Sequence, residues 1–121
     1  MEKKKVLIVE DDPISELILL NLTETICSNQ YTATSGEEAI QLCKQHKDIN
    51  FILMDIKMKG MDGYTATQEI RKFNKKVIIF AQTAYAQPAD REKAIQSGCN
   101  EHIAKPIDRN EFYRLVNKYF Q

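Results

Sequence analysis

The stretch Val6-Leu-Ile-Val-Glu-Asp-Asp-Pro13 joins four apolar residues directly to three acidic residues and a proline. An unbroken apolar run predicts a strand that is buried on both faces, as in a parallel sheet covered by helices. Asp12 followed by Pro13 is typical of a helix N-cap with proline in the first turn. The stretch therefore predicts a buried strand that ends in acidic residues and passes at once into a helix.

Similar strands are predicted farther along the chain. Residues 51–54 and 77–80 form further unbroken apolar runs, and residues 31–34 and 102–104 are weaker strand candidates. Longer amphipathic stretches separate these runs, so strands and helices alternate. This alternation predicts an α/β fold with a parallel sheet and right-handed crossovers. Because no repeat or linker interrupts it, we predict one domain over residues 1–121 with no attached output domain.

Capping signals place several helix ends. Ser35 and Glu38 have the spacing of a capping box, in which the glutamate reaches back to the backbone amide of the cap residue. Asp108 and Glu111 repeat that spacing, and Gly98 is typical of a helix C-terminus. Apolar residues with helical periodicity predict a last helix that packs on the core: Phe112, Leu115, Val116, Tyr119 and Phe120.

Composition narrows the functional classes. In 121 residues, 17 Lys and Arg balance 17 Asp and Glu, which does not favour direct binding to nucleic acid. Cys27, Cys43 and Cys99 are odd in number and widely spaced, so neither a disulfide framework nor a zinc site is predicted. The apolar runs are too short for a membrane span or a signal-peptide core. We therefore expect a soluble, cytoplasmic protein with reduced thiols and no membrane insertion.

The residues that end the predicted strands form the candidate site. Glu10 and Asp11 follow the first strand, Asp55 the third, Thr83 the fourth and Lys105 the fifth. In a parallel sheet these positions share one edge, which is where ligands bind. Carboxylates brought together repel one another unless a cation joins them. Ligands that are all oxygen favour a hard cation, so the sequence predicts a Mg²⁺ site at this edge.

These residues, in this order, resemble the response-regulator receiver family of two-component signalling. Shorter motifs extend the resemblance over essentially the whole chain: Met54–Met58, Met61–Gly63, Thr83–Ala86 and Gly98–Asn100. The resemblance implies a three-layer, doubly wound, flavodoxin-like fold with five parallel strands in the order 2-1-3-4-5. The residues around Glu10, Thr83 and Lys105 look especially like receiver modules attached to hybrid histidine kinases.

For Asp55, the resemblance implies the role of phosphoacceptor. Its carboxylate would take a phosphoryl group from the phosphohistidine of a histidine kinase or a histidine phosphotransfer domain. Asp11 and Asp55 would bind Mg²⁺ directly, together with the backbone carbonyl of Lys57, and Glu10 would hold the ion mainly through water. Asp12 is better explained as a helix cap than as a ligand.

Thr83 and Lys105 would bind phosphoryl oxygens, so that transfer would depend on charge neutralisation and positioning. A shift near Thr83 would then change the face formed by the fourth helix, the fifth strand and the fifth helix, where an output partner would bind. The implied role is that of a regulatory phosphoacceptor and not of an enzyme, although it would promote its own phosphorylation and dephosphorylation.

Five positions tune this site or depart from the family pattern. Lys57 and Tyr85 occupy positions that control the lifetime of the acyl phosphate in the family. His102 stands where an aromatic switch residue is usual, which leaves open both a pH-sensitive coupling and an immobile spacer. Lys59 replaces a usual proline, and Gln82 stands where an apolar residue is common.

Two other functions stay open on the sequence. A small aspartyl phosphatase or phosphotransferase would share the arrangement at the sheet edge, but such enzymes usually carry a second acidic residue where this chain has Lys57. A flavodoxin-type electron carrier would need a Ser-, Thr- or Gly-rich phosphate loop after the first strand, where this chain has acidic residues 10–12. These patterns specify neither the kinase nor the output target nor the oligomeric state. They also do not separate a free-standing regulator from a hybrid-kinase module.

Overall fold

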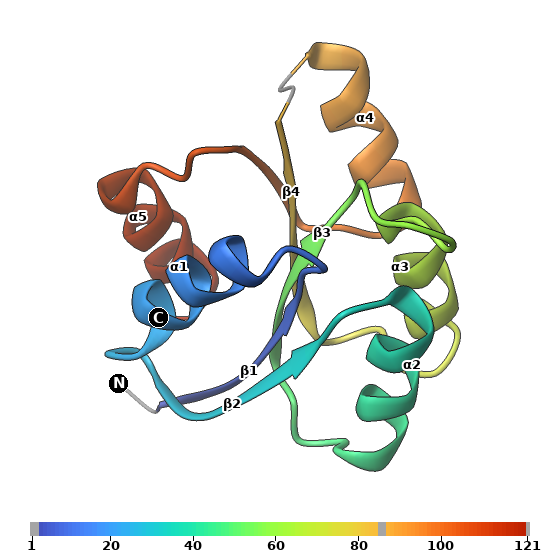
Figure 1. Ribbon diagram of the computed structural model, residues 1–121, viewed down its shortest axis with the longest axis horizontal. Coiled ribbons are helices and arrows are strands. Elements are labelled where there is room, and N and C mark those ends of the chain that lie inside the picture. The colour runs from blue at the N-terminus through green and yellow to red at the C-terminus, as the bar shows by residue number, and fades with distance from the viewer. Residues whose placement is uncertain (1–2, 85–86, 121) are drawn as a thin grey trace.

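Strands and helices alternate along the chain in the computed structural model, which describes residues 3–84 and 87–120 (Figure 1). The strands are β1 (Lys4–Val9), β2 (Cys27–Ala33), β3 (Phe51–Asp55), β4 (Ile78–Thr83) and β5 (Glu101–Ala104). The helices are α1 (Pro13–Thr23), α2 (Gly36–Gln45), α3 (Gly63–Arg71), α4 (Pro88–Ser97) and α5 (Arg109–Phe120). The alternation predicted from the apolar runs is confirmed.

A parallel sheet forms the middle layer, and its strand order is β2-β1-β3-β4-β5. Helices α1 and α5 cover one face of the sheet, and α2, α3 and α4 cover the other (Figure 1). Each face has its own apolar core, because the side chains of a strand alternate between faces. Phe51 and Phe80 belong to the core beneath α1 and α5, whereas Ile52 and Ile79 belong to the core on the opposite face. The fold is therefore the doubly wound one that the sequence implied.

Strands β2 and β4 extend farthest beyond their predicted limits. The edge strand β2 begins at Cys27 and not at residue 31, because its first half is polar and exposed and carries no apolar signal. Strand β4 continues to Thr83, beyond the predicted end at residue 80, because it includes the polar Gln82. Apolar runs therefore located the strands but underestimated their lengths.

The predicted helix caps are present. The Asp12 carboxylate accepts a hydrogen bond from the Ser15 amide at 2.9 Å, and the Ser35 hydroxyl accepts one from the Glu38 amide at 3.1 Å. The Glu38 carboxylate, however, accepts from the Thr34 amide at 2.7 Å, one residue before the position predicted. The long glutamate side chain thus reaches past the cap residue, and Asp12 has the structural role that we expected.

The last helix and the cysteines also follow the prediction. In α5, Phe112, Leu115 and Val116 are buried, and Tyr119 and Phe120 pack against the same core. The three cysteines are free and buried. Among the described residues, no helix combines the length and the apolar character that a bilayer span requires.

Candidate functional site

Strand register brings the acidic residues of β1 and β3 together at the carboxyl edge of the sheet. Val9 pairs with Met54, and Asp55 pairs with Gln82, so Glu10, one residue beyond β1, lies beside Asp55 of β3, which in turn lies beside Gln82 of β4. Because parallel strands end at a common edge, Asp11 emerges at the same place, where the chain turns into α1. The convergence predicted from the strand ends is therefore present in the structure.

The three carboxylates form a compact cluster. One oxygen from each of Glu10, Asp11 and Asp55 lies within 4.8 Å of the others. Glu10 is 1 % exposed and Asp55 is 3 % exposed, whereas Asp11 faces solvent. Such a cluster needs positive charge, because burial removes the water that would otherwise solvate the carboxylates.

Lys105 supplies part of that charge. Its Nζ lies 2.9 Å from Glu10 Oε1 and 3.1 Å from Asp55 Oδ1, so one ammonium bridges the two buried carboxylates. Burial alone would lower the pKa of Lys105, but hydrogen bonds to Glu10 and Asp55 and their negative charges raise it. The side chain therefore stays charged, and sequence reasoning had placed it at a phosphoryl oxygen without foreseeing this contact with the carboxylates.

The pKa of the Asp55 carboxyl group is shifted strongly by its surroundings in this site. Burial, reinforced by the neighbouring Glu10 charge, raises the pKa of Asp55 to about 6, although Lys105 opposes the change. A pKa of about 6 still leaves Asp55 mainly ionised at neutral pH, so its buried carboxylate calls for positive charge beside it.

A hard divalent cation fits this donor set. The candidate ligands in the cluster offer only oxygen, and no Cys or His belongs to it among the described residues. Carboxylate oxygens of which one is open to solvent suit Mg²⁺, which keeps several waters when it binds to proteins. Three residues predicted to bind Mg²⁺, Glu10, Asp11 and Asp55, are thus brought together, and the Lys57 carbonyl as a further ligand stays a prediction.

Thr83 and Lys57 lie beside the start of α3, because they share a cavity with its cap residue, Asp62. Both line a cavity of about 270 Å³ whose wall also includes Met58 and Asp62. The Thr83 carbonyl accepts a hydrogen bond from the Lys105 amide at 2.8 Å, which ties the end of β4 to the segment that carries Lys105. Their roles toward a phosphoryl group stay predictions, and Tyr85 lies outside the described residues.

His102 lies within β5, where it pairs with Ala81. Its ring is partly buried, and its Nε2 is buried without a hydrogen-bond partner in the part of the chain that the structure describes. Burial lowers the pKa of His102, which favours the neutral ring at neutral pH. The pH-sensitive coupling and the immobile spacer both stay predictions for His102.

Gly63 is a site residue whose role sequence reasoning did not identify. Its amide donates to the Ile56 carbonyl at 2.9 Å, and a Cβ at this position would lie 2.8 Å from the Ile56 Cα and would also collide with the Asp55 carbonyl. The only sequence signal was the motif Met61–Gly63, because a close approach between two backbones is visible only in three dimensions. Gly63 lets the start of α3 pack directly against the backbone of Asp55.

Replacing Gly63 by Ala is expected to destabilise the protein by about 1–3 kcal/mol, as overpacking against rigid groups does. Gly36→Ala is the matched control: its Cβ would meet the flexible end of Met61 at 3.0 Å and the Ala66 Cβ at 3.2 Å, so a side-chain movement and a shift of a few tenths of an ångström relieve it, whereas Gly63→Ala meets backbone atoms. Urea unfolding of the two variants measures the difference. If Gly63→Ala and Gly36→Ala have equal free energies of unfolding, the backbone at Asp55 moves aside without a cost in stability, which would contradict the prediction.

Comparisons with known proteins agree with this geometry. The family profile of the response regulator receiver domain matches residues 6–117. Two-component system protein A of Emericella nidulans is 34% identical over 120 residues, which cover 98% of this chain and 18% of that protein. The chain spans less than a fifth of the length of that protein and of two similar hybrid signal transduction histidine kinases, L and G, of Dictyostelium discoideum.

Two solved structures are similar in sequence and in shape. The receiver domain of the sensor histidine kinase PA1611 of Pseudomonas aeruginosa, with magnesium coordinated in its active-site cleft, is 31% identical with a TM-score of 0.86, and 98% of each chain is covered. The second structure is a co-crystal of the histidine phosphotransfer protein Ypd1 of Saccharomyces cerevisiae with the receiver domain of its downstream response regulator Ssk1. The matching chain is 30% identical in sequence to this one, with a TM-score of 0.88. That match covers 97% of this chain and 88% of the other.

Proposed function

Because this chain belongs to the response-regulator receiver domain family and so to two-component phosphorelay signalling, we propose that Asp55 is the residue that accepts the phosphoryl group. The observation that carries the proposal is the position of Asp55. It is 3 % exposed, beside Glu10 and Asp11, and in contact with the Lys105 ammonium at 3.1 Å. A single receiver domain over residues 1–121 that acts in the cytoplasm is part of the same proposal.

The reaction transfers a phosphoryl group between two side chains. An Asp55 carboxylate oxygen attacks the phosphorus of a phosphohistidine; the O–P bond forms, the N–P bond breaks, and the imidazole nitrogen keeps the electron pair. Lys105 stabilises negative charge on the phosphoryl oxygens, and the Thr83 hydroxyl donates a hydrogen bond to one of them. Glu10, Asp11, Asp55 and the Lys57 carbonyl would hold Mg²⁺, which neutralises charge on the phosphoryl group when it is bound.

The product is a regulatory signal and not a released compound. We propose that the chain promotes its own phosphorylation and the later hydrolysis of the acyl phosphate, with Lys57 and Tyr85 controlling how long it lasts. Lys57 occupies the position where an aspartyl phosphatase would carry an acid–base catalyst, which supports the regulatory role over the enzymatic alternative.

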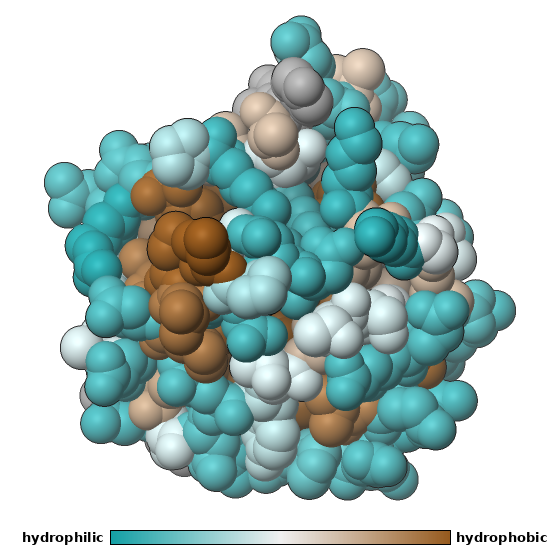
Figure 2. Space-filling model, in the orientation of Figure 1, coloured by the Kyte–Doolittle hydropathy of each residue, from teal (hydrophilic) through white to brown (hydrophobic). Residues whose placement is uncertain are grey.

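The proposed donor is a histidine phosphotransfer protein or a histidine kinase, and α1 offers it a docking surface. Ile14, Leu17 and Ile18 are 70%, 65% and 59% exposed, and their spacing places them on one side of α1. Figure 2 shows the apolar patch over this helix. Helix α1 starts directly after Glu10 and Asp11, so a partner bound to the patch would reach Asp55. Apolar patches on a small domain often mark such surfaces.

Replacing Leu17 by Glu is expected to slow transfer from a phosphorylated histidine phosphotransfer protein by about tenfold or more, as the loss of a central interface residue does. Labelling by phosphoramidate, which needs no docking, should stay unchanged. Ile95→Glu on α4 is the matched control, since Ile95 is also exposed at 43%. A rapid-quench comparison of the two donors measures both rates. Parallel losses with both donors would place the effect in the site itself.

The output face is proposed to combine α4, β5 and α5. Glu101 on β5 accepts hydrogen bonds from Arg91 of α4 and from Lys118 and Tyr119 of α5, the last at 2.6 Å. Burial alone would raise the pKa of Glu101, but these donors lower it. A charged, fully bonded carboxylate thus connects the three elements, which supports their acting as one surface.

Labelling of the intact protein tests the proposed function. Incubation with Mg²⁺ and phosphoramidate, followed by peptide mapping in a mass spectrometer, should place one phosphoryl group on Asp55, and EDTA should prevent it. A phosphorylated histidine phosphotransfer protein should label the same residue. Labelling at another residue, or equal labelling in EDTA, would overturn the proposal.

A further inference from the structure

Gln82 is a buried polar residue that phosphoryl transfer does not use. It lies next to Asp55 on the neighbouring strand and is 1 % exposed. Its side-chain nitrogen is buried and has no hydrogen-bond partner among residues 3–84 and 87–120. Buried donors without partners are uncommon and costly, so an unpaired amide calls for a physical explanation.

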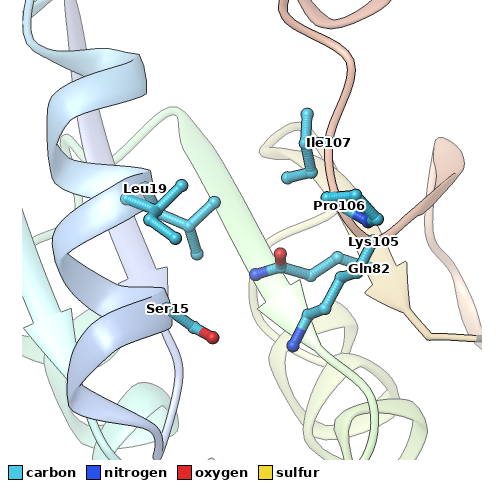
Figure 3. Close-up of a pocket in the computed structure, with 7 residues that line it drawn as sticks. Ser15, Leu19, Gln82, Lys105, Pro106 and Ile107 are labelled. Carbon is cyan, nitrogen blue, oxygen red and sulfur yellow. The ribbon is translucent and has the colours of Figure 1, made fainter.

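The amide faces a cavity of about 330 Å³ between α1 and the segment that follows β5. Figure 3 shows the Gln82 amide pointing into the space that separates Leu19 from Pro106 and Ile107. The cavity is lined by Ser15, Ile18, Leu19, Gln82, Lys105, Pro106 and Ile107. Its volume lies at the lower end of the range for small-molecule pockets, which is roughly 300–1,000 Å³.

The other polar side chains of the wall already have partners. The Lys105 ammonium is bonded to Glu10 and Asp55, and the Ser15 hydroxyl donates to the Asp12 carboxylate at 2.8 Å. Gln82 therefore presents an N–H donor that no described side chain uses, and the rest of the lining is mainly apolar.

Charge further restricts what can bind. Lys105 is the charged residue of the lining, and its ammonium is already bonded to two carboxylates, Glu10 and Asp55; Asp11 belongs to the same cluster, and Asp12 accepts the Ser15 hydroxyl. An anionic ligand would meet this negative field, whereas a neutral oxygen acceptor would not.

We infer that the cavity beside Gln82 is a binding site for a small neutral molecule that has an apolar body and one hydrogen-bond-accepting oxygen, such as a carbonyl. The body packs between Ile18 and Leu19 of α1 and Pro106 and Ile107, and the oxygen accepts from the Gln82 amide. Lys105 forms part of the wall, so the occupant also contacts the residue that bridges Asp55 and Glu10. The site thus provides a second input next to the phosphoacceptor.

Acetophenone is a suitable probe, because it is neutral, mostly apolar and carries one carbonyl. Titration of the ¹⁵N-labelled protein should give saturable NMR shifts at the cavity, including a downfield shift of the Gln82 side-chain N–H signals. Gln82→Met keeps the shape of the side chain but removes the donor, and binding should weaken about two- to tenfold, as for the loss of one net hydrogen bond. Gln68→Met, on the exposed side of α3, is the matched control and should bind as the wild type does.

Two further measurements make the outcome decisive. Benzoate, which has the same shape but a negative charge, should bind more weakly than acetophenone. Asp55→Asn should still bind acetophenone, so a failure of the phosphoacceptor proposal would leave this result intact. Shifts that do not saturate or that centre elsewhere, no response of the Gln82 side-chain signals, or benzoate binding as tightly as acetophenone would each overturn the inference. The wild-type measurements decide it even where Gln82→Met does not fold.

Discussion

Replacing Asp55 by Asn is expected to stabilise the metal-free protein at neutral pH, although it removes the proposed phosphoacceptor. Burial and the Glu10 charge raise the pKa of Asp55 from 3.8 to about 6. A raised pKa stabilises the fold while the group is protonated, fully so below pH 3.8. That contribution is lost as pH rises through about 6, because the folded protein must then hold an ionised, buried carboxylate.

The expected gain is at most about 3 kcal/mol, since each unit of difference in pKa is worth about 1.4 kcal/mol. Urea unfolding in EDTA at pH 4 and pH 7.5 measures it: Asp55→Asn should gain stability over wild type only at the higher pH. Mg²⁺ should shrink the gain, because it binds the wild-type carboxylates and stabilises that protein by mass action.

Asp48→Asn is a control for which the expected change in stability at pH 7.5 has the opposite sign. The Asp48 carboxylate is exposed and pairs with Lys5 at 2.7 Å, and the hydrogen bond from Lys5 lowers its pKa. A lowered pKa contributes stability above the unfolded value, and the contribution is lost as pH falls. Asp48→Asn should therefore lose a little stability at pH 7.5. An Asp55→Asn variant that behaves in the same way would show that the Asp55 carboxylate is not destabilised in the native site.

Much of the site could be predicted from the sequence, because its residues lie at or just after the ends of strands. Glu10, Asp55 and Lys105 each follow an apolar run, and parallel strands bring their ends to one edge whatever the details of packing. The helix caps were equally accessible, since a cap is a local pattern of a few residues. Long-range proximity could thus be predicted wherever it reduces to topology.

Other features depend on contacts that no local pattern contains. The first half of β2 is polar because it lies at a sheet edge, and an exposed edge strand needs no apolar run. Gly63 is required because the backbone of Asp55 and Ile56 lies too close for a Cβ. The Gln82 amide is unpaired because no acceptor among the described residues lies within hydrogen-bond distance of it. Distances of a few tenths of an ångström between segments decide such features, and those come only from the assembled fold.

The bridge formed by Lys105 has the largest expected consequence for function. In Lys105→Met, phosphoramidate labelling of Asp55 should fall by about 100-fold or more, as for the loss of one preorganised charge at a transition state. Metal-free stability should also fall, by roughly 3–5 kcal/mol at pH 7.5, because two buried carboxylates lose their common partner. Lys72→Met is the matched control: Lys72 pairs with Glu69 at the surface, where such pairs contribute at most about 1 kcal/mol.

A double-mutant cycle separates the charge of Lys105 from its packing. If the loss in Lys105→Met comes from unpaired charge, adding Asp55→Asn should recover a large part of it, since only Glu10 then lacks the ammonium. Mg²⁺ should likewise stabilise Lys105→Met more than it stabilises the wild type, because the ion then supplies the only positive charge among the three carboxylates. Strictly additive effects of the two substitutions on the free energy of unfolding would mean that Lys105 and Asp55 act independently. The bridge seen at 3.1 Å would then have no energetic role, and the lost labelling in Lys105→Met would have to come from contacts made only with the phosphoryl group.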